Sequence, residues 1–305
     1  GYPKYDQVTG LLSFNRFREE VDSVIASGKG KSCLLVYTDL ENFKYFNRKY
    51  GYAAGDQLLR EFTGYIIDTL KKRNTAHFTR VVADQFILFF EEKWNNGSIE
   101  AIKRINNGFI ERQQRKYPEA KLRLRTGVYK VEKDCDGASF AIDAANYARR
   151  QIQDNSPETV CVYDKTMADL QNMENEIAIG LDKAIKNKEF KIYLQPRFSL
   201  TTGKIVGAES LVRWQREDGT ILPPDSFIPV YEKNGRIIDL DFYMFEETVK
   251  LLANWKEQGI PQRLISINAS ALHAQNSDTV HRYTTILEKY GVDPALIELE
   301  LTETA

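Results

Sequence analysis

The sequence has 305 residues, of which 42% are apolar and 28% are charged, a composition that excludes a disordered tail, a collagen-like fibre and a coiled-coil rod. Its 42 Lys and Arg residues nearly balance its 43 Asp and Glu residues, so no excess of positive charge is present to bind a nucleic-acid backbone. We therefore expect a globular protein without a DNA or RNA partner.

Length and cysteine usage predict the domain count and the compartment. At about 150 residues per domain, the chain is long enough for two domains. The three cysteines, Cys33, Cys135 and Cys161, are scattered and lack a metal-ligand spacing, so we expect reduced thiols in a cytoplasmic protein. The longest apolar runs, such as Phe86–Phe90, are far too short to span a membrane, and no membrane segment is predicted.

Helical and strand patterns alternate through the first half. Apolar residues at helical spacing predict helices at 11–27, 55–72, 99–116 and 139–153. Continuous apolar runs predict strands at 32–40, 122–131 and 159–163, and a strand–turn–strand hairpin at 77–90. This order predicts an α/β domain over residues 1–165, with one mixed sheet and flanking helices.

A helix at 165–188 is expected to leave the first domain, so that residues 166–188 connect it to a second domain at 189–305. Strands are predicted there at 190–197, 204–214, 263–270 and 297–302, with helices at 239–258 and 278–290. Strand–helix repeats indicate a (β/α) barrel, which needs eight strands and about 250 residues. With four strands present, a start at Gly1 and an abrupt end at Ala305, we expect part of a barrel from a longer protein.

Polar residues of the first half could form a metal or nucleotide site. Asp39 closes a predicted buried strand, Asp84 lies at the turn of the hairpin, and Asn47 and Asp56 lie in and after a helix-like stretch. Two carboxylates and an amide from separate elements suit a hard divalent ion and a polar base. The alternative is that the acids only cap helices and stabilise a turn.

Three segments of the first half resemble GGDEF domains, the diguanylate cyclase family. Residues 5–17 (YDQVTGLLSFNRF) resemble its D-x-LTGL-x-NR opening, residues 39–59 its D-x-D-x-F-K-x-x-N-D-x-x-G-H-x-x-G-D-x-x-L segment, and residues 143–150 (DAANYARR) its D-x-A-L-Y-x-A-K helix. The resemblance covers about residues 5–164. It implies a metal held by Asp39 and Asp84, and nucleotide contacts from Lys44, Asn47, Asp56 and Arg150.

Departures from the family pattern gather around the expected phosphates. The Gly-Gly-Asp-Glu-Phe signature stands here as Val82-Ala83-Asp84-Gln85-Phe86, and Asp154 stands where the family has Arg. Side chains at the two glycine positions intrude on the nucleotide, the amide of Gln85 weakens metal binding, and Asp154 would repel a triphosphate. We expect no cyclase activity, and two alternatives stay open: GTP binding through the surviving contacts, or pure scaffolding.

Three predicted strands of the second half place polar side chains on one face. Glu209, Leu211 and Arg213 share a face, as do Ser266 and Asn268 on the next strand and Glu298, Glu300 and Thr302 on the last. Charges inside a barrel are costly unless they are paired or bind a metal. The alternative is a buried Glu–Arg pair with polar residues at exposed edges.

The same strands resemble EAL domains, phosphodiesterases that hydrolyse cyclic di-GMP to linear pGpG. The similar segments, spread over about residues 190–305, are YLQP at 193–196, GAESLVRW at 207–214, PDSFIPVYEKNG at 224–235, ISINAS at 265–270 and ELELTET at 298–304. The resemblance implies that Glu209, Asn268 and Glu300 are catalytic ligands of Mg²⁺ or Mn²⁺. It also implies substrate-side roles for Gln195, Leu211, Arg213 and Glu303, of which Glu303 would position a loop.

Two functional hypotheses follow. The first is a cyclic di-GMP phosphodiesterase that is regulated by a degenerate cyclase domain, with the 305-residue piece itself inactive because later ligands of the family lie beyond it. The second is a receptor or scaffold that binds cyclic di-GMP without catalysis. GTP as a second ligand and a homodimer are open under both hypotheses.

Overall fold

The computed structural model of the chain describes residues 3–73 and 75–302. It divides into two compact units, residues 1–171 and 172–305, which are described separately. The helix α6, Lys165–Lys186, contains the division between them. Within the described ranges, no helix combines the length and the apolar character that a membrane crossing requires.

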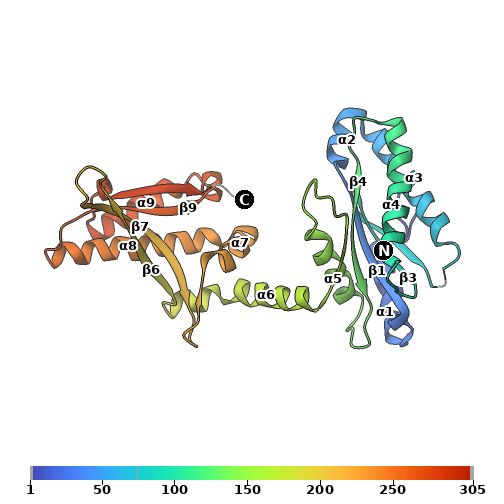
Figure 1. Cartoon of the computed structure of the whole chain (residues 1–305), viewed down its shortest axis with the longest axis horizontal. Helices are drawn as coiled ribbons and strands as arrows, with labels where there is room; N and C mark the ends of the chain where they lie inside the picture. Colours follow the sequence, from blue (N-terminus) through green and yellow to red (C-terminus); the bar gives the residue numbers. More distant parts are fainter. Residues whose placement is uncertain (1–2, 74, 303–305) are drawn as a thin grey trace. The chain divides into compact units, whose positions relative to one another are not determined.

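The first unit is built on one mixed sheet with the strand order β2-β3-β1-β4-β5 (Figure 1). The first four strands in this order pair antiparallel, and β5 joins β4 in parallel. The strands are β1 (Cys33–Glu41), β2 (His77–Val82), β3 (Gln85–Glu91), β4 (Arg123–Lys130) and β5 (Val160–Val162). All nine residues of β1 are buried, because helices cover both faces of the sheet.

Alternation along β1 decides which side chain meets which helices. Leu34 and Val36 pack against the layer of α2, α3 and α4, whereas Leu35 and Tyr37 pack against α1 and α5. The helices are α1 (Phe14–Ala26), α2 (Phe43–Tyr50), α3 (Tyr52–Leu70), α4 (Ser98–Lys116) and α5 (Ala138–Arg150), with a 3₁₀ turn at Lys29–Ser32. Asp39 follows the same period as Leu35 and Tyr37, so its side chain lies on the α5 side.

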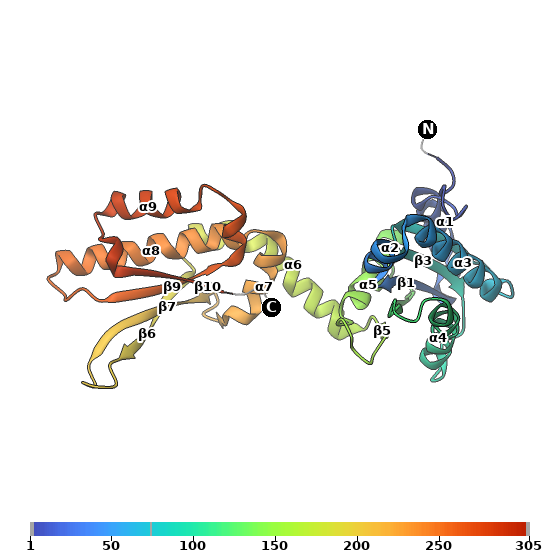
Figure 2. The ribbon, with the colours of Figure 1, turned by 90° about the horizontal axis from the view of Figure 1, so that it is seen from above.

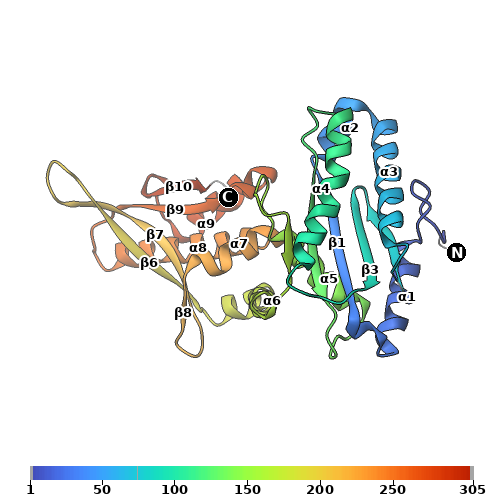
Figure 3. The same cartoon turned by 45° about the vertical axis from the view of Figure 1, so that its right-hand side comes forward.

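The second unit is an open sheet with the path β10-β9-β7-β6, and β8 pairs with β7. β6 and β7 form a long antiparallel hairpin (Figure 3), and β7, β9 and β10 are parallel. The strands are β6 (Phe190–Phe198), β7 (Ile205–Gln215), β8 (Ile221–Leu222), β9 (Leu264–Ser270) and β10 (Ile297–Thr302). Over the described residues this sheet does not close, as the prediction of a partial barrel requires.

Helices of the second unit cover one face of that sheet, as Figure 2 shows for α8 and α9. They are α7 (Pro224–Asn234), α8 (Ile237–Glu257) and α9 (Thr279–Tyr290), with 3₁₀ turns at Ala271–Gln275 and Pro294–Leu296. Ile265 and Ile267 of β9 are buried against α8 and α9, which leaves Ser266 and Asn268 on the opposite face. The polar face predicted for the strands is thus the one that the helices do not cover.

The predicted α/β architecture is confirmed, and the differences are local. Helix α7 was not predicted, because Pro229 lies inside it and proline normally interrupts a helix. Asp39 does not end its strand, since β1 continues through Glu41.

Candidate functional sites

Asp39 lies directly opposite an arginine of the neighbouring strand. The register of β1 and β4 pairs Asp39 with Arg125 and Glu41 with Arg123. Arg125 grips Asp39 with two parallel bonds, Nε to Oδ1 at 3.0 Å and Nη2 to Oδ2 at 2.9 Å. Such two-pronged bonds are among the strongest hydrogen bonds in proteins. The bonds to Asp39 raise the pKa of Arg125 further.

A second arginine reaches Asp39 from helix α5. Nη1 of Arg149 donates to Asp39 Oδ2, and its guanidinium lies 5.0 Å from the centre of the Tyr37 ring. Nε and Nη2 of Arg149 donate to Asn146 Oδ1 at 3.0 and 2.7 Å, which fixes the guanidinium from the other side. Asp39 therefore faces two cationic groups in a setting where its own side chain is only 4% exposed.

Helix α5 can bring Arg149 this close because Gly127 has no side chain. A Cβ at Gly127 would lie 2.0 Å from the backbone oxygen of Ala145 and 2.4 Å from the backbone nitrogen of Arg149. No real Cβ tolerates such distances, so the glycine allows the helix backbone to rest directly on β4. Arg149 then projects from the otherwise apolar inner face of α5 toward Asp39.

The hairpin between β2 and β3 brings Asp84 to the same end of β1. Asp84 Oδ2 accepts a hydrogen bond from the backbone nitrogen of Leu40 at 3.0 Å. Burial raises the pKa of the Asp84 carboxyl, and the negative charge of Asp39 raises it further. The two predicted metal ligands are thus neighbours, but only Asp39 is held by arginines.

The two residues beside Asp84 explain what the changed hairpin signature does. Ala83 adopts φ +47°, a left-handed conformation that costs an alanine about 1 kcal/mol and a glycine almost nothing. Gln85 accepts a hydrogen bond from the Tyr37 hydroxyl at 2.7 Å through its side-chain oxygen. That amide oxygen is therefore already used inside the protein.

Asp154, the acid expected to repel a triphosphate, has a partner. Its Oδ1 accepts a bond from Nη1 of Arg125 at 2.6 Å, while the other nitrogens of Arg125 hold Asp39. Nearby, Arg123 pairs with Glu41 and also donates to the backbone oxygens of Gln153 and Ser156. The negative charges of Asp154 and Glu41 are therefore balanced by Arg125 and Arg123.

The expected nucleotide contacts are less connected. A Cβ at Gly55 would lie 1.8 Å from Asn47 Oδ1, so the Asn47 amide rests on the turn of α3 that carries Asp56. Asn47 Oδ1 is buried and has no hydrogen-bond partner among the described residues, which leaves this polar atom open to a ligand. Lys44 and Arg150 have exposed side chains, and Arg150 lies over the Tyr147 ring at 6.0 Å.

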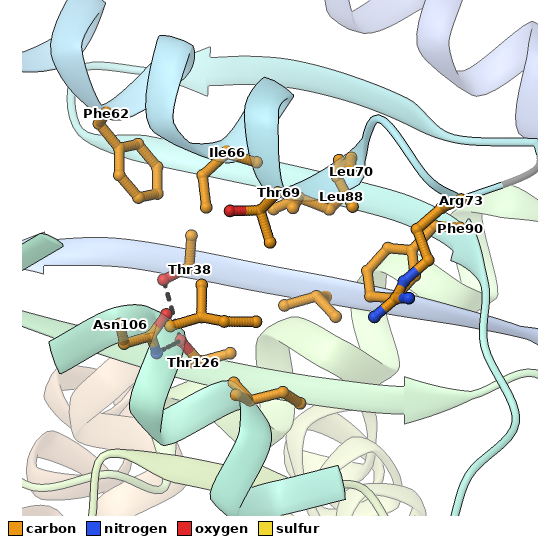
Figure 4. Close-up of a pocket in the computed structure, with 13 residues that line it drawn as sticks. Thr38, Phe62, Ile66, Thr69, Leu70, Arg73, Leu88, Phe90, Asn106 and Thr126 are labelled. Carbon is orange, nitrogen blue, oxygen red and sulfur yellow. Dashed lines mark hydrogen bonds between the residues drawn. The ribbon is translucent and has the colours of Figure 1, made fainter. Parts of the chain in front are cut away.

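A separate cavity lies on the opposite face of the same sheet, between the strands and helices α3 and α4 (Figure 4). Thr38, Thr126 and Asn106 are hydrogen-bonded to one another at one end, and Arg73 lies at the other. Its volume of about 60 Å³ is well below the roughly 300 Å³ at which ligand pockets begin. It is a packing gap and does not enlarge the Asp39 site.

In the second unit, the register of the sheet aligns polar side chains in a row. Gln195 of β6 pairs with Glu209 of β7, Glu209 with Ser266 of β9, and Ser266 with Glu298 of β10. The Asn268 amide nitrogen donates to Glu209 Oε1 at 3.0 Å. Two of the three predicted metal ligands are therefore in direct contact.

Glu300, the third predicted ligand, contacts Arg197. Nη2 of Arg197 donates to Glu300 Oε1 at 2.5 Å, and its Nη1 lies 3.8 Å from Glu298 Oε1. This hydrogen bond lowers the pKa of Glu300. Because the two side chains are 42% and 36% exposed, the pair is open to solvent and easily exchanged.

The remaining predicted residues lie around this row. Gln195 is exposed, and Arg213 places its guanidinium 5.7 Å from the centre of the Tyr193 ring. Leu211 and Asn268 help to line a cavity of about 290 Å³ that opens toward α7. Glu303 lies outside the described residues.

Ser210, which replaces the alanine of the EAL triplet, points away from the row. Its hydroxyl is buried and lies 3.1 Å from that of Thr248 on α8. Thr248 in turn donates to the backbone oxygen of Met244. The serine is therefore satisfied within the core, and this departure leaves the polar face unchanged.

The Asp39 site of the first unit and the Glu209–Asn268 pair of the second unit differ in how well they suit a divalent metal. Glu209 and Asn268 offer oxygens on an uncovered face, which suits Mg²⁺ or Mn²⁺. Asp39 has three N–H donors on its two oxygens, and Gln85 is bonded to Tyr37. Over residues 3–73 and 75–302, no three Asp, Glu, His or Cys side chains converge as a ready metal-ligand set.

The sequence analysis did not identify the arginines that bond to Asp39 in the first unit and to Glu300 in the second. Arg149 stands at the alanine before the last position of the D-x-A-L-Y-x-A-K pattern, and it follows Ala138, Ala141 and Ala145 on the apolar face of α5. An arginine on such a face needs an acidic partner, which is a signal that could have been read. Arg197 carries no comparable signal, because it lies on an exposed stretch of β6.

Comparisons with known proteins agree with both resemblances. The model of the diguanylate cyclase GGDEF domain matches residues 3–157, and the model of the EAL domain matches residues 180–305. The chain is 26% identical over 310 residues to the cyclic di-GMP phosphodiesterase PdeR of Escherichia coli K12, covering 98% of this chain and 45% of that protein. It is 22% identical over 294 residues to the bifunctional diguanylate cyclase/cyclic di-GMP phosphodiesterase MucR of Pseudomonas aeruginosa, covering 96% and 42%.

One solved structure shares the fold along the chain. The Vibrio cholerae LapD S helix-GGDEF-EAL structure, bound to cyclic di-GMP, matches with a TM-score of 0.57 and 17% identity, over 98% of this chain and 69% of that one. The chain spans less than half the length of the two curated relatives named above.

Proposed function

Because this chain belongs to the diguanylate cyclase GGDEF family and carries an EAL domain behind its GGDEF domain, we propose that it serves cyclic di-GMP signalling. In this proposal the second unit is the phosphodiesterase part, which cleaves cyclic di-GMP to linear pGpG. The first unit is a cyclase-like domain without cyclase activity that regulates the second. The proposal places the protein in the cytoplasm, where its three free cysteines would stay reduced.

The observation that carries the proposal is the contact between Glu209 and Asn268 on the uncovered face of the second sheet. Glu209, Asn268 and Glu300 would hold Mg²⁺ or Mn²⁺, with the Asn268 amide turned to present its oxygen and Glu300 released by Arg197. When bound, the metal supplies an acidified water for attack on a phosphodiester. Gln195, Leu211 and Arg213 would hold the dinucleotide beside it, and Glu303 would position a loop.

Regulation by the first unit is supported by what its site retains and what it has lost. Asn47 keeps a buried, unpaired amide oxygen beside Asp56, which suits the edge of a guanine base. Asp39 is neutralised by two arginines, which disfavours a metal-bound triphosphate in the cyclase geometry. GTP binding without turnover therefore fits this unit better than catalysis.

The test is an assay of the full-length protein that contains residues 1–305, with cyclic di-GMP and Mn²⁺. We expect wild type to release linear pGpG and Glu209→Gln to release at least about 100-fold less, because the change removes a ligand charge and keeps the shape. Circular dichroism of the variant checks the fold.

A receptor is the second candidate, favoured by the engagement of Glu300 with Arg197. Cyclic di-GMP binding to wild type without pGpG at any Mn²⁺ concentration would establish the receptor and reject the phosphodiesterase. A homodimer is open under either candidate, and light scattering of the same preparation measures it.

A further inference from the structure

The Asp39 site contains its own cations. We propose that the guanidinium groups of Arg125 and Arg149 take the place of a divalent metal ion at Asp39, so that the first unit keeps the form of a metal-dependent nucleotide site but excludes the metal. The inference deepens the proposed silent role of the first unit and rests on that role. It concerns metal binding alone and not the phosphodiesterase reaction.

The first argument is the saturation of the carboxylate. Two Asp39 oxygens offer roughly four lone-pair positions, and three N–H donors from the two arginines occupy three of them. A metal would have to displace at least one guanidinium. The displaced guanidinium would stay beside the metal, since the Arg149 side chain is only 10% exposed and is bonded to Asn146.

The second argument is that packing holds both guanidinium groups in place beside Asp39. Arg125 is held in register opposite Asp39 by the β1–β4 ladder and by Asp154. Arg149 is held by the close contact of α5 with β4 that Gly127 permits. Arginine stays protonated at all accessible pH values, so the site cannot be vacated by titration of these groups.

The third argument is that the neighbouring metal ligand of the family pattern has also been redirected. Gln85 stands where the family has a carboxylate, and its oxygen accepts the Tyr37 hydroxyl. Asp84 keeps a carboxylate beside Asp39, and its Oδ2 accepts a hydrogen bond from the backbone nitrogen of Leu40. Loss of the carboxylate at position 85 and the arginine at position 149, where the family pattern has alanine, act in the same direction.

The test uses Tb³⁺ as a probe of hard-cation sites, excited through tyrosine. Tyr37 lies 5.0 Å from the Arg149 guanidinium and would sensitise an ion that took its place. All proteins carry Glu209→Gln, which silences the second unit. The series is the background alone, Arg149→Ala, Arg149→Gln and Arg125→Gln/Arg149→Ala, each with and without Asp39→Asn.

We expect no emission that depends on Asp39 while both arginines are present. Removing them should produce saturable emission that is lost again with Asp39→Asn. Arg104→Ala, which removes an exposed arginine from α4 on the other side of the sheet, should change nothing. Circular dichroism checks each fold, and Arg149→Gln keeps most of the side-chain volume if alanine unfolds the unit.

Two results would overturn the proposal. One is Asp39-dependent emission with both arginines in place, since the metal would then coexist with them. The other is absence of emission from the folded double variant, since the arginines would then not be what excludes the ion. Neither result bears on pGpG release, so failure of this inference and failure of the proposed phosphodiesterase are distinguishable.

Discussion

Asp39 and Glu300 are both predicted metal ligands, and each is bonded to arginine, but the two pairs differ in burial. Asp39 is 4% exposed and is held by two arginines, whereas Glu300 is 36% exposed and is held by one arginine, Arg197. Removing one partner of a buried pair is costly, whereas an exposed pair contributes little and exchanges readily. The same kind of ion pair is therefore costly to break at Asp39 and readily exchanged at Glu300.

The comparison also separates two kinds of departure from a family pattern. Around Asp39 the changes support one another, because Asp154 balances Arg125 while Arg125 balances Asp39. In the second unit, the Ser210 hydroxyl lies in the core against that of Thr248, and Glu209 and Asn268 stay in contact on the polar face.

The largest effect is expected from the second site. In the full-length protein, Asn268→Ala and Glu300→Gln should each lower pGpG release by at least about 100-fold, and combining them should add little, because ligands of one metal act as a unit. Glu298→Gln is the matched control, since Glu298 is exposed on the same strand and does not contact Glu209 or Asn268. A loss as large in Glu298→Gln would show that general charge, and not ligation, sets the rate.

The next largest effect concerns the stability of the first unit. Arg149→Ala should lower the free energy of unfolding by about 2–3 kcal/mol, less than the roughly 3–5 kcal/mol of a fully broken buried pair because Arg125 stays bonded to Asp39. Urea unfolding measures the change. Arg150→Ala removes an exposed arginine from the same helix, and an equal loss there would contradict the special role of Arg149.

The sequence was sufficient for the architecture and for the shared face of Glu209 and Asn268. Period-two alternation in β7, β9 and β10 correctly placed Glu209 and Asn268 on one face, because a strand's side chains can point in only two directions. The approach of α5 to β4 could not be read in the same way. It depends on Gly127 meeting Ala145 and Arg149 across the fold, and such a contact leaves no local pattern.

The partners of Asp39 could not be predicted for a related reason. Asp39 and Asp84 were identified individually, and they do lie at the same end of β1. Their charge partners come from β4 and α5, 86 and 110 residues away from Asp39 in sequence. Asp154 was interpreted as repulsive because its partner Arg125 was not considered with it.

A smaller effect should follow from freeing Glu300. Arg197→Ala removes an exposed pair, so the Mn²⁺ concentration for half-maximal pGpG release should fall by about two- to fivefold. A titration of activity with Mn²⁺ measures this. An unchanged or higher concentration would show that Arg197 does not compete with the metal.

The smallest effect is a pH dependence that belongs to the first unit. Burial lowers the pKa of His77, against a weaker opposing effect of Glu20. In the unfolded chain the pKa of His77 is about 6.5, and above that pH the histidine is mostly neutral in both the folded and the unfolded state. As the pH falls below about 6.5, the unfolded chain binds the proton first, so the free energy of unfolding decreases. His77→Phe should flatten this loss between pH 7.5 and pH 5.5 in urea unfolding, whereas His281→Phe, at an exposed position, should not.

The contrast between the two sites is tested most directly by counting bound Mn²⁺ in the full-length protein. Electron paramagnetic resonance measures the free ion in titrations of wild type, Asp39→Asn and Glu209→Gln. We predict that Asp39→Asn binds as much Mn²⁺ as wild type and that Glu209→Gln loses the bound ion. Loss of Mn²⁺ in Asp39→Asn, with Glu209→Gln unchanged, would contradict the account, because the metal would then reside in the unit that we describe as closed to it.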